Sequence, residues 1–202
     1  MSRCEEFDEF DEPFPNARAM YAANADRALR GKRGRAMLAD LREALLALPD
    51  RRLVSGALST ASLRRWVDAG GDGAAERWPH AWEDDRSAAD ALVEREGIGV
   101  CAVGAYCWWK AVEGGADPRE AMAELPVTAD LLGENEEDTA LAGEAAGMSR
   151  IVAREIVWLN DGSFGGCTPE ERYERVLRWI GGRIGPRATE PTSAASTGRR
   201  GA

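Results

Sequence analysis

The stretch from residue 100 to residue 112 is the feature that most constrains the fold, because its side chains are apolar or small over nearly its whole length. Written as a helix, it is apolar on two neighbouring faces: Cys101, Ala105, Trp108 and Val112 on one, and Val100, Gly104, Cys107 and Ala111 on the other. A helix apolar over so wide an arc has to be surrounded by other elements. The run is interrupted by Lys110 and is too short to span a bilayer. We therefore predict a central core helix.

Two further segments show a clear helical period. In residues 32–48, leucines recur at spacings of three and four, and Pro49 ends the pattern. In residues 149–159, the spacing predicts inward positions for Ile151, Val152, Ile156 and Leu159. The sequence Asn160-Asp161-Gly162 is typical of a turn and predicts the end of this helix.

A third clear helix, over residues 168–180, carries a start signal. Thr168 is the expected N-cap, Pro169 the first helical residue and Glu171 the reciprocal carboxylate of a capping box. The periodicity predicts a buried stripe of Tyr173, Val176, Leu177 and Ile180.

Weaker helical patterns fill much of the remaining chain, at residues 16–30, 60–69, 85–96, 118–125 and 135–146. Residues 52–58 suit a short extended piece, and no longer alternating run occurs. We therefore expect a mainly α fold, a single-domain irregular bundle of about seven to eight helices with at most a short strand pair. We divide the chain into an acidic flexible arm (1–15), a helical domain (16–184) and a disordered tail (185–202).

The charge balance excludes some classes of function. The chain has 202 residues and a formal net charge of −9, which argues against a dedicated nucleic-acid binder. Four cysteines lie far apart in a chain too large to need disulfide staples, and no signal peptide precedes them. We therefore expect a cytoplasmic protein in a reducing compartment, with no membrane partner.

Candidate reaction centres are weak. Cys101 and Cys107 would lie about 120° apart on a helix, and no CxxC pair occurs, so a zinc site is disfavoured. A nucleophile would require Cys107 beside His80, the only histidine, yet a thiol in the most apolar helix is expected to be inert packing. Adjacent carboxylates at helix starts are explained by the helix dipole.

Residues 160–171 resemble a calcium loop in part. Gly165 falls at position six and Glu171 at position twelve, but Gly162 and Phe164, at positions three and five, have no side-chain oxygen. We therefore expect no metal, no cofactor and no catalytic residue.

Two surface features are better candidates for binding. A basic cluster surrounds Gly31 and Gly34 and consists of Arg27, Arg30, Lys32, Arg33 and Arg35. A glycine-rich stretch at 70–84 carries tryptophans, and aromatic residues are enriched in recognition surfaces. The residues that we predict to contact a partner are Trp78, His80, Trp82, Arg30 and Arg33.

Several blocks of the sequence, taken together, resemble a group of small helical proteins encoded by bacteriophages, especially those of actinobacteria. The blocks lie at residues 33–38, 48–49, 52–54, 99–104, 155–156, 160–161, 168–173 and 178–180. The resemblance covers about half of the chain. It implies a phage or prophage source and a helical fold, and it supplies no activity.

We therefore expect a non-enzymatic protein that binds a host or viral protein. It would act either as a modulator of a host process, in one version as a DNA mimic through its acidic faces, or as a virion or assembly component. One alternative is a DNA-associated regulator that uses the basic cluster at 27–35, and another is an enzyme of unknown class that uses Cys107, His80 or Asp161. Association into a homo-oligomer is left open.

Overall fold

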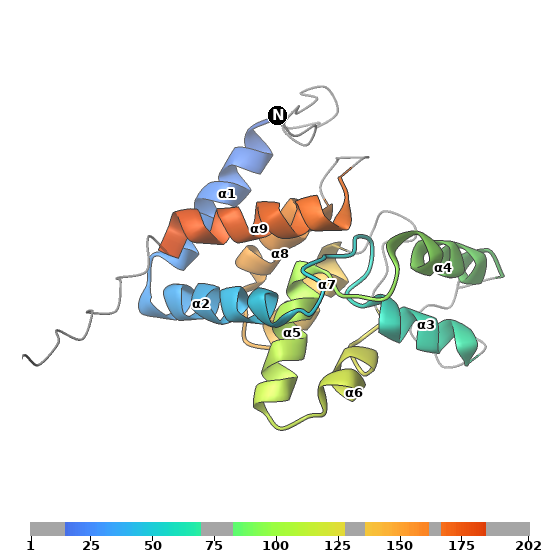
Figure 1. The fold of residues 1–202 in the computed structure, drawn as a ribbon. Helices are drawn as coiled ribbons and strands as arrows, with labels where there is room; N and C mark the ends of the chain where they lie inside the picture. The colour runs from blue at the N-terminus through green and yellow to red at the C-terminus, as the bar shows by residue number, and fades with distance from the viewer. Residues whose placement is uncertain (1–14, 70–82, 128–135, 162–166, 185–202) are drawn as a thin grey trace, which may run out of the picture.

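The computed structural model describes residues 15–69, 83–127, 136–161 and 167–184. In these ranges the chain forms nine helices and no β-strand (Figure 1). In chain order the helices are α1 (Pro15–Leu29), α2 (Lys32–Ala47), α3 (Thr60–Asp68), α4 (Glu83–Glu96), α5 (Ala102–Glu113), α6 (Pro118–Ala123), α7 (Glu136–Ala145), α8 (Arg150–Asp161) and α9 (Pro169–Ile184). The predicted all-α class is confirmed, with nine described helices where about seven to eight were expected.

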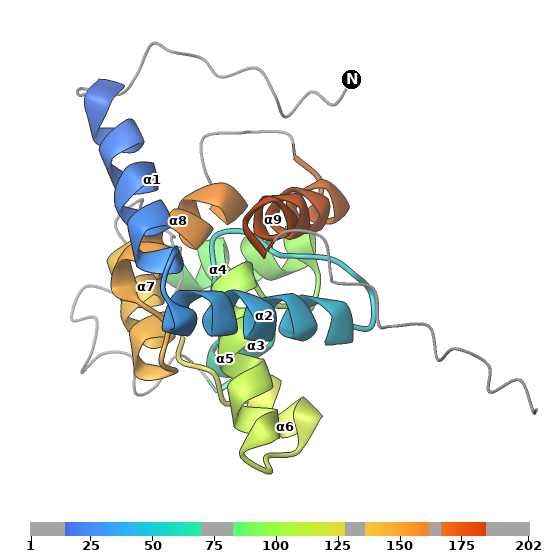
Figure 2. The ribbon, with the colours of Figure 1, turned by 90° about the vertical axis from the view of Figure 1, so that its left-hand side faces the viewer.

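Helix α5 lies at the centre, and α2, α6, α7 and α8 all pack against it (Figures 1 and 2). Every residue from 102 to 108 is buried, so the prediction of a surrounded helix is confirmed. The helix begins two residues later than its apolar pattern, because Cys101 is the N-cap. Its Sγ accepts a hydrogen bond from the amide of Gly104 at 3.3 Å.

Gly104 is required by the close approach of another backbone segment. A Cβ at this position would lie 2.1 Å from the carbonyl oxygen of Leu58, which precedes α3. The amide of Cys101 donates to that same oxygen at 3.1 Å. The small residue therefore lets the extended segment before α3 lie directly against the start of α5.

Helices α2, α8 and α9 bury apolar faces that their periodicity predicts; α2 and α8 pack on α5, and α9 packs on α2 and α8. Their buried side chains include Leu38, Leu41 and Leu45 on α2, Val152 and Ile156 on α8, and Tyr173, Val176 and Ile180 on α9. The capping box of α9 is confirmed. The Glu171 amide donates to Oγ1 of Thr168 at 3.2 Å, and the Thr168 amide donates to Oε2 of Glu171 at 2.9 Å.

Helices α3 and α4 form a second, smaller cluster beside the main core (Figure 1). Its buried residues are Ala57, Leu63, Val67, Ala89, Leu92 and Val93. Helix α3 also contacts α6, which in turn packs on α5. The molecule therefore has two apolar clusters of unequal size.

Two details of the expected helix 149–159 are wrong. The helix continues through Asn160 to Asp161, so these residues are helical rather than a turn. Ile151, expected to point inward, is 45% exposed. The helix continues because the side chain of Asn160 is buried and hydrogen-bonds to backbone groups of other segments. Ile151 is exposed because the buried face of α8 runs through Val152, Ile156 and Asn160.

The extended piece expected at 52–58 is present and leads into α3. The amide of Val54 donates to the carbonyl of Val100 at 3.1 Å, and Ser59 and Val100 form a single antiparallel bridge. This pairing is too short to count as a strand in the part of the chain that the structure describes, in line with the expectation of at most a short strand pair.

Several sequence expectations lie outside the described residues. These are the acidic arm up to residue 14, the stretch 70–82 with Trp78, His80 and Trp82, most of the calcium-like loop at 162–166, and the tail at 185–202. Among the helices that the structure does describe, none combines the length and the apolar character needed to cross a bilayer.

Candidate functional site

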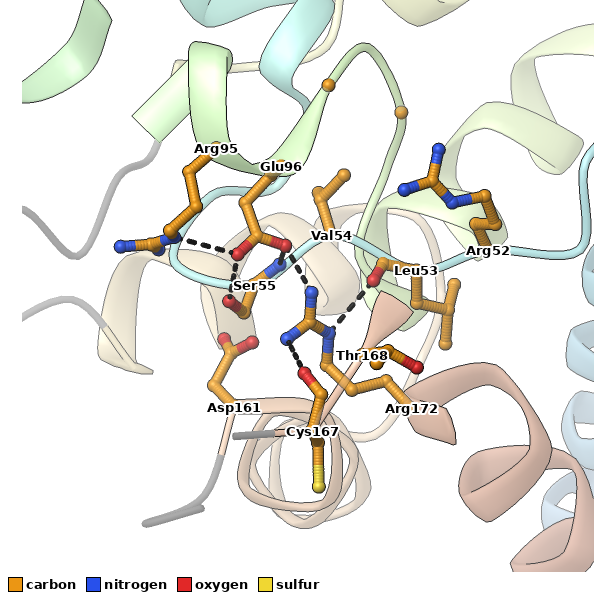
Figure 3. A network of polar contacts seen from close by, with 12 residues as sticks. Arg52, Leu53, Val54, Ser55, Arg95, Glu96, Asp161, Cys167, Thr168 and Arg172 are labelled. Atoms are coloured by element: carbon orange, nitrogen blue, oxygen red, sulfur yellow. Dashed lines mark hydrogen bonds and ion pairs between the residues drawn. The ribbon is translucent and has the colours of Figure 1, made fainter. Parts of the chain in front are cut away.

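The first candidate is a buried polar network at the C-terminal end of α4, which Figure 3 shows. Its centre is an ion pair between Arg172 of α9 and Glu96 of α4, with side chains only 8% and 6% exposed. Arg172 also donates from Nε to the carbonyl of Leu53 and from Nη1 to the carbonyl of Cys167, both at 2.9 Å. One guanidinium therefore joins α4, α9 and the extended segment after α2.

The carboxylate of Glu96 accepts hydrogen bonds through both of its oxygens. Its Oε2 accepts from the amide of Ser55 at 3.2 Å, and its Oε1 accepts from Oγ of Ser55 at 3.2 Å and from Nε of Arg95 at 3.0 Å. Buried charges persist only when they are paired and hydrogen-bonded in this way. The network therefore holds segments together, since the contacts found for both charged groups are with neighbouring parts of the protein.

Close to this ion pair, the side chain of Asn160 also joins several segments by hydrogen bonds. Its Oδ1 accepts from the amide of Ala102 at 3.1 Å, and its Nδ2 donates to the carbonyl of Val54 at 2.7 Å and to the neighbouring carboxylate of Asp161. The side chain thus joins α8 to the start of α5 and to the extended segment. The spacing of apolar residues gave no indication of this role.

The thiols of α5 are buried and weakly acidic. Burial, followed by the charge of Asp161, raises the pKa of Cys101 far above its usual range. Burial raises the pKa of Cys107 to about 12. A nucleophilic cysteine needs a depressed pKa, so the burial of Cys107 gives no support to the disfavoured alternative of a nucleophile paired with His80, which lies outside the described residues.

The second candidate is an open pocket of about 540 Å³ where the end of α1, the start of α2 and the end of α9 meet. These three ends lie together at the left of Figure 1, and Figure 2 looks onto them. The lining residues are Asp26, Leu29, Arg30, Arg35, Gly182 and Arg183. Three of these six lining residues are therefore arginines.

Arg183 is held firmly in this pocket. Its Nε and Nη2 both donate to Oδ1 of Asp26, at 2.9 and 2.7 Å, and Nη1 donates to the carbonyl of Trp179 at 3.3 Å. Its guanidinium also lies 4.1 Å from the centre of the Trp179 ring, a cation–π contact. The third arginine of the pocket is therefore fixed in place before any ligand arrives.

Arg30 and Arg35 differ from Arg183. Both residues are exposed, and within the described parts of the chain neither side chain makes a hydrogen bond or an ion pair. Arginine carries five N–H donors and keeps its charge at any physiological pH. The pocket therefore presents two free guanidiniums to whatever enters it.

The sequence predicted this site in part. Arg30, one of the predicted contact residues, lines the pocket; Arg33, another, lies exposed on α2 and is not among the lining residues. Asp26 and Arg183 were missed, because they are 157 positions apart in the chain. The only local indication was the spacing of Trp179 and Arg183, which places the two side chains on one face of a helix.

No metal centre is formed by the described residues, since none of their His, Cys, Asp and Glu side chains gather in groups of three or more that could hold an ion. Comparison with known proteins adds nothing to the geometry: no family model, curated protein or solved structure matches the chain. The resemblance to bacteriophage proteins accordingly stays a prediction.

Proposed function

We propose that the protein is a non-enzymatic binding protein that captures an anionic segment of a partner protein in the arginine-lined pocket. The observation that carries this proposal is the pair of free guanidiniums, Arg30 and Arg35, in an open pocket beside the fixed Arg183. Charge-assisted hydrogen bonds from arginine to carboxylate or phosphate are among the strongest that proteins make.

The remaining polar groups support binding over catalysis. Glu96, Arg172 and Asn160 use their side chains to fix the packing of the helices, and the buried thiol of Cys107 stays protonated. A net charge of −9 argues against duplex DNA as the partner, because DNA binding depends on neutralising many phosphates over a wide surface, whereas a short anionic segment needs only the local charge of the pocket. The expectations of a bacteriophage source and of a host or viral partner in the cytoplasm belong to the same proposal.

The test is a fluorescence-anisotropy titration of labelled poly-L-glutamate with the full chain. The Arg30→Gln/Arg35→Gln variant should bind at least about tenfold more weakly, the loss expected when charge-assisted hydrogen bonds are removed. The matched control is Arg27→Gln/Arg33→Gln, which changes the net charge equally in the same basic cluster but outside the pocket. The control should bind almost as well as the natural chain.

Two outcomes contradict the proposal. Equal losses in the two double variants would show that diffuse charge rather than the pocket binds the anion. Tighter binding of duplex DNA than of poly-L-glutamate, lost in both variants and falling steeply with salt, would favour a DNA-associated regulator that uses the basic cluster at 27–35.

A further inference from the structure

We infer that the group recognised in this pocket is a phosphoryl group on the partner protein, an inference that rests on the proposed function and makes it more specific. The net charge of the pocket matches a phosphoryl group better than a carboxylate. Arg30, Arg35 and Arg183 supply three positive charges and Asp26 one negative charge, so the pocket carries a net charge of +2. A phosphorylated side chain carries about −1.5 to −2 at neutral pH, whereas a carboxylate carries only one negative charge.

The number of free guanidinium donors in the pocket also suits a phosphoryl group. Arg183 is already engaged with Asp26 and with the carbonyl of Trp179, so Arg30 and Arg35 are left to bind the ligand. One guanidinium is enough to satisfy the two oxygens of a carboxylate. Two free guanidiniums match a phosphoryl group, which has three strong acceptor oxygens to share between them.

Asp26 both fixes Arg183 and lowers the positive charge of the pocket. Its carboxylate holds Arg183 in position and also places a fixed negative charge at the wall of the pocket. This charge repels a dianion more than a monoanion, but the three arginines outweigh it, so the net attraction is still larger for the dianion. The apolar side chain of Leu29 and the bare backbone of Gly182 leave room for the rest of the side chain that carries the phosphoryl group.

The experiment is an NMR titration of the full-length protein with three short Gly-Ala peptides that carry phosphoserine, glutamate or serine at the same position. We expect the phosphoserine peptide to bind at least about tenfold more tightly than the glutamate peptide, and to shift the amide signals of Arg30, Arg35 and Gly182. Because the second phosphate pKa is near 6, its affinity should rise between about pH 5.5 and about pH 7.5, while that of the glutamate peptide stays nearly constant.

Variants and outcomes separate this inference from the proposed function. Arg30→Gln/Arg35→Gln should abolish the preference for phosphoserine, and Arg27→Gln/Arg33→Gln should keep it. Equal affinity for the glutamate and phosphoserine peptides at the pocket would overturn the phosphoryl assignment and leave the proposed function intact. Binding of neither peptide would overturn the phosphoryl assignment and the proposed function together. Tighter binding of a single-stranded oligonucleotide to the same amides would overturn the assignment of the phosphoryl group to a partner protein.

Discussion

The buried contact between Arg172 and Glu96 lies where α4, α9 and the segment after α2 converge. Removing two charges from water is expensive, and such a pair repays the expense only when every donor and acceptor is used. Both side chains are well supplied with partners here: Glu96 accepts through both carboxylate oxygens, and Arg172 donates from all three of its side-chain nitrogens. The pair therefore fixes how the segments are arranged more than it adds stability.

Removing one partner of this pair should be severe. Arg172→Leu removes the buried charge partner of Glu96 and leaves only the exposed Arg95 beside its carboxylate, so we expect the free energy of unfolding to fall by about 3–5 kcal/mol. The control is Arg64→Leu, which breaks exposed ion pairs with Asp68 and Asp90 and should cost about 1 kcal/mol or less. Urea unfolding followed by circular dichroism measures both, and equal losses would contradict the account.

The buried thiols give a prediction with a defined direction in pH. With a pKa of about 12, Cys107 is a thiolate in only about one molecule in ten thousand at about pH 8. Iodoacetamide should therefore label Cys107 and Cys101 far more slowly in the native protein than in urea, and the native rate should rise with pH well beyond pH 9. Mass spectrometry of the labelled peptides measures the rates, and rapid native labelling of Cys107 would contradict its placement in the core.

The packing of helix α5 depends on Gly104, which has no side chain. Gly104→Ala would place a Cβ against the carbonyl oxygen of Leu58, 2.1 Å away, so either α5 or the preceding segment has to move. We expect a loss of about 1–3 kcal/mol, the usual cost of overpacking. Gly181→Ala is the control, because nothing lies within 4 Å of a Cβ at that position of α9.

The Gly181→Ala control should instead raise the free energy of unfolding. An alanine in place of glycine in an unobstructed helix stabilises by about 0.5–1 kcal/mol. Thermal unfolding of the two variants gives the comparison. A Gly104→Ala protein as stable as the natural chain would contradict the close packing of α5 against the segment after α2.

The pairing of α3 with α4 should be less protected from hydrogen exchange than the main core. Its cluster is small and is separate from the main core, so opening it exposes less apolar surface than opening α5 or α8 does. Native-state hydrogen exchange should show faster amide exchange in α3 than in the interior of α5. Equal protection would indicate that the two clusters unfold as one unit.

Helices were predictable where the sequence alone carries the cause of the structure. The leucine period of residues 32–48 and the capping pair Thr168 and Glu171 depend on near neighbours, and the structure confirms both. The end of α8 was not predictable. Asn160 is typical of a turn by local rules, but its side chain is satisfied by Val54 and Ala102, which are remote in sequence.

The whole molecule combines an acidic net charge with one basic end. The ends of α1, α2 and α9 bring Arg30, Arg35 and Arg183 to one pocket, although the chain carries a net charge of −9. The basic cluster indicated one side of this pocket, because its residues are close in sequence. The other side comes from α9, and only the packing of α9 beside α1 and α2 brings it there.

If an anion binds at this pocket, amide mapping by NMR will locate it there. When poly-L-glutamate is added to the isotopically labelled chain, the largest shifts should fall on Leu29, Arg30, Arg35, Gly182 and Arg183, with α4 and α6 unchanged. Shifts that are absent, or that spread over the surface without a maximum at these residues, would contradict the account.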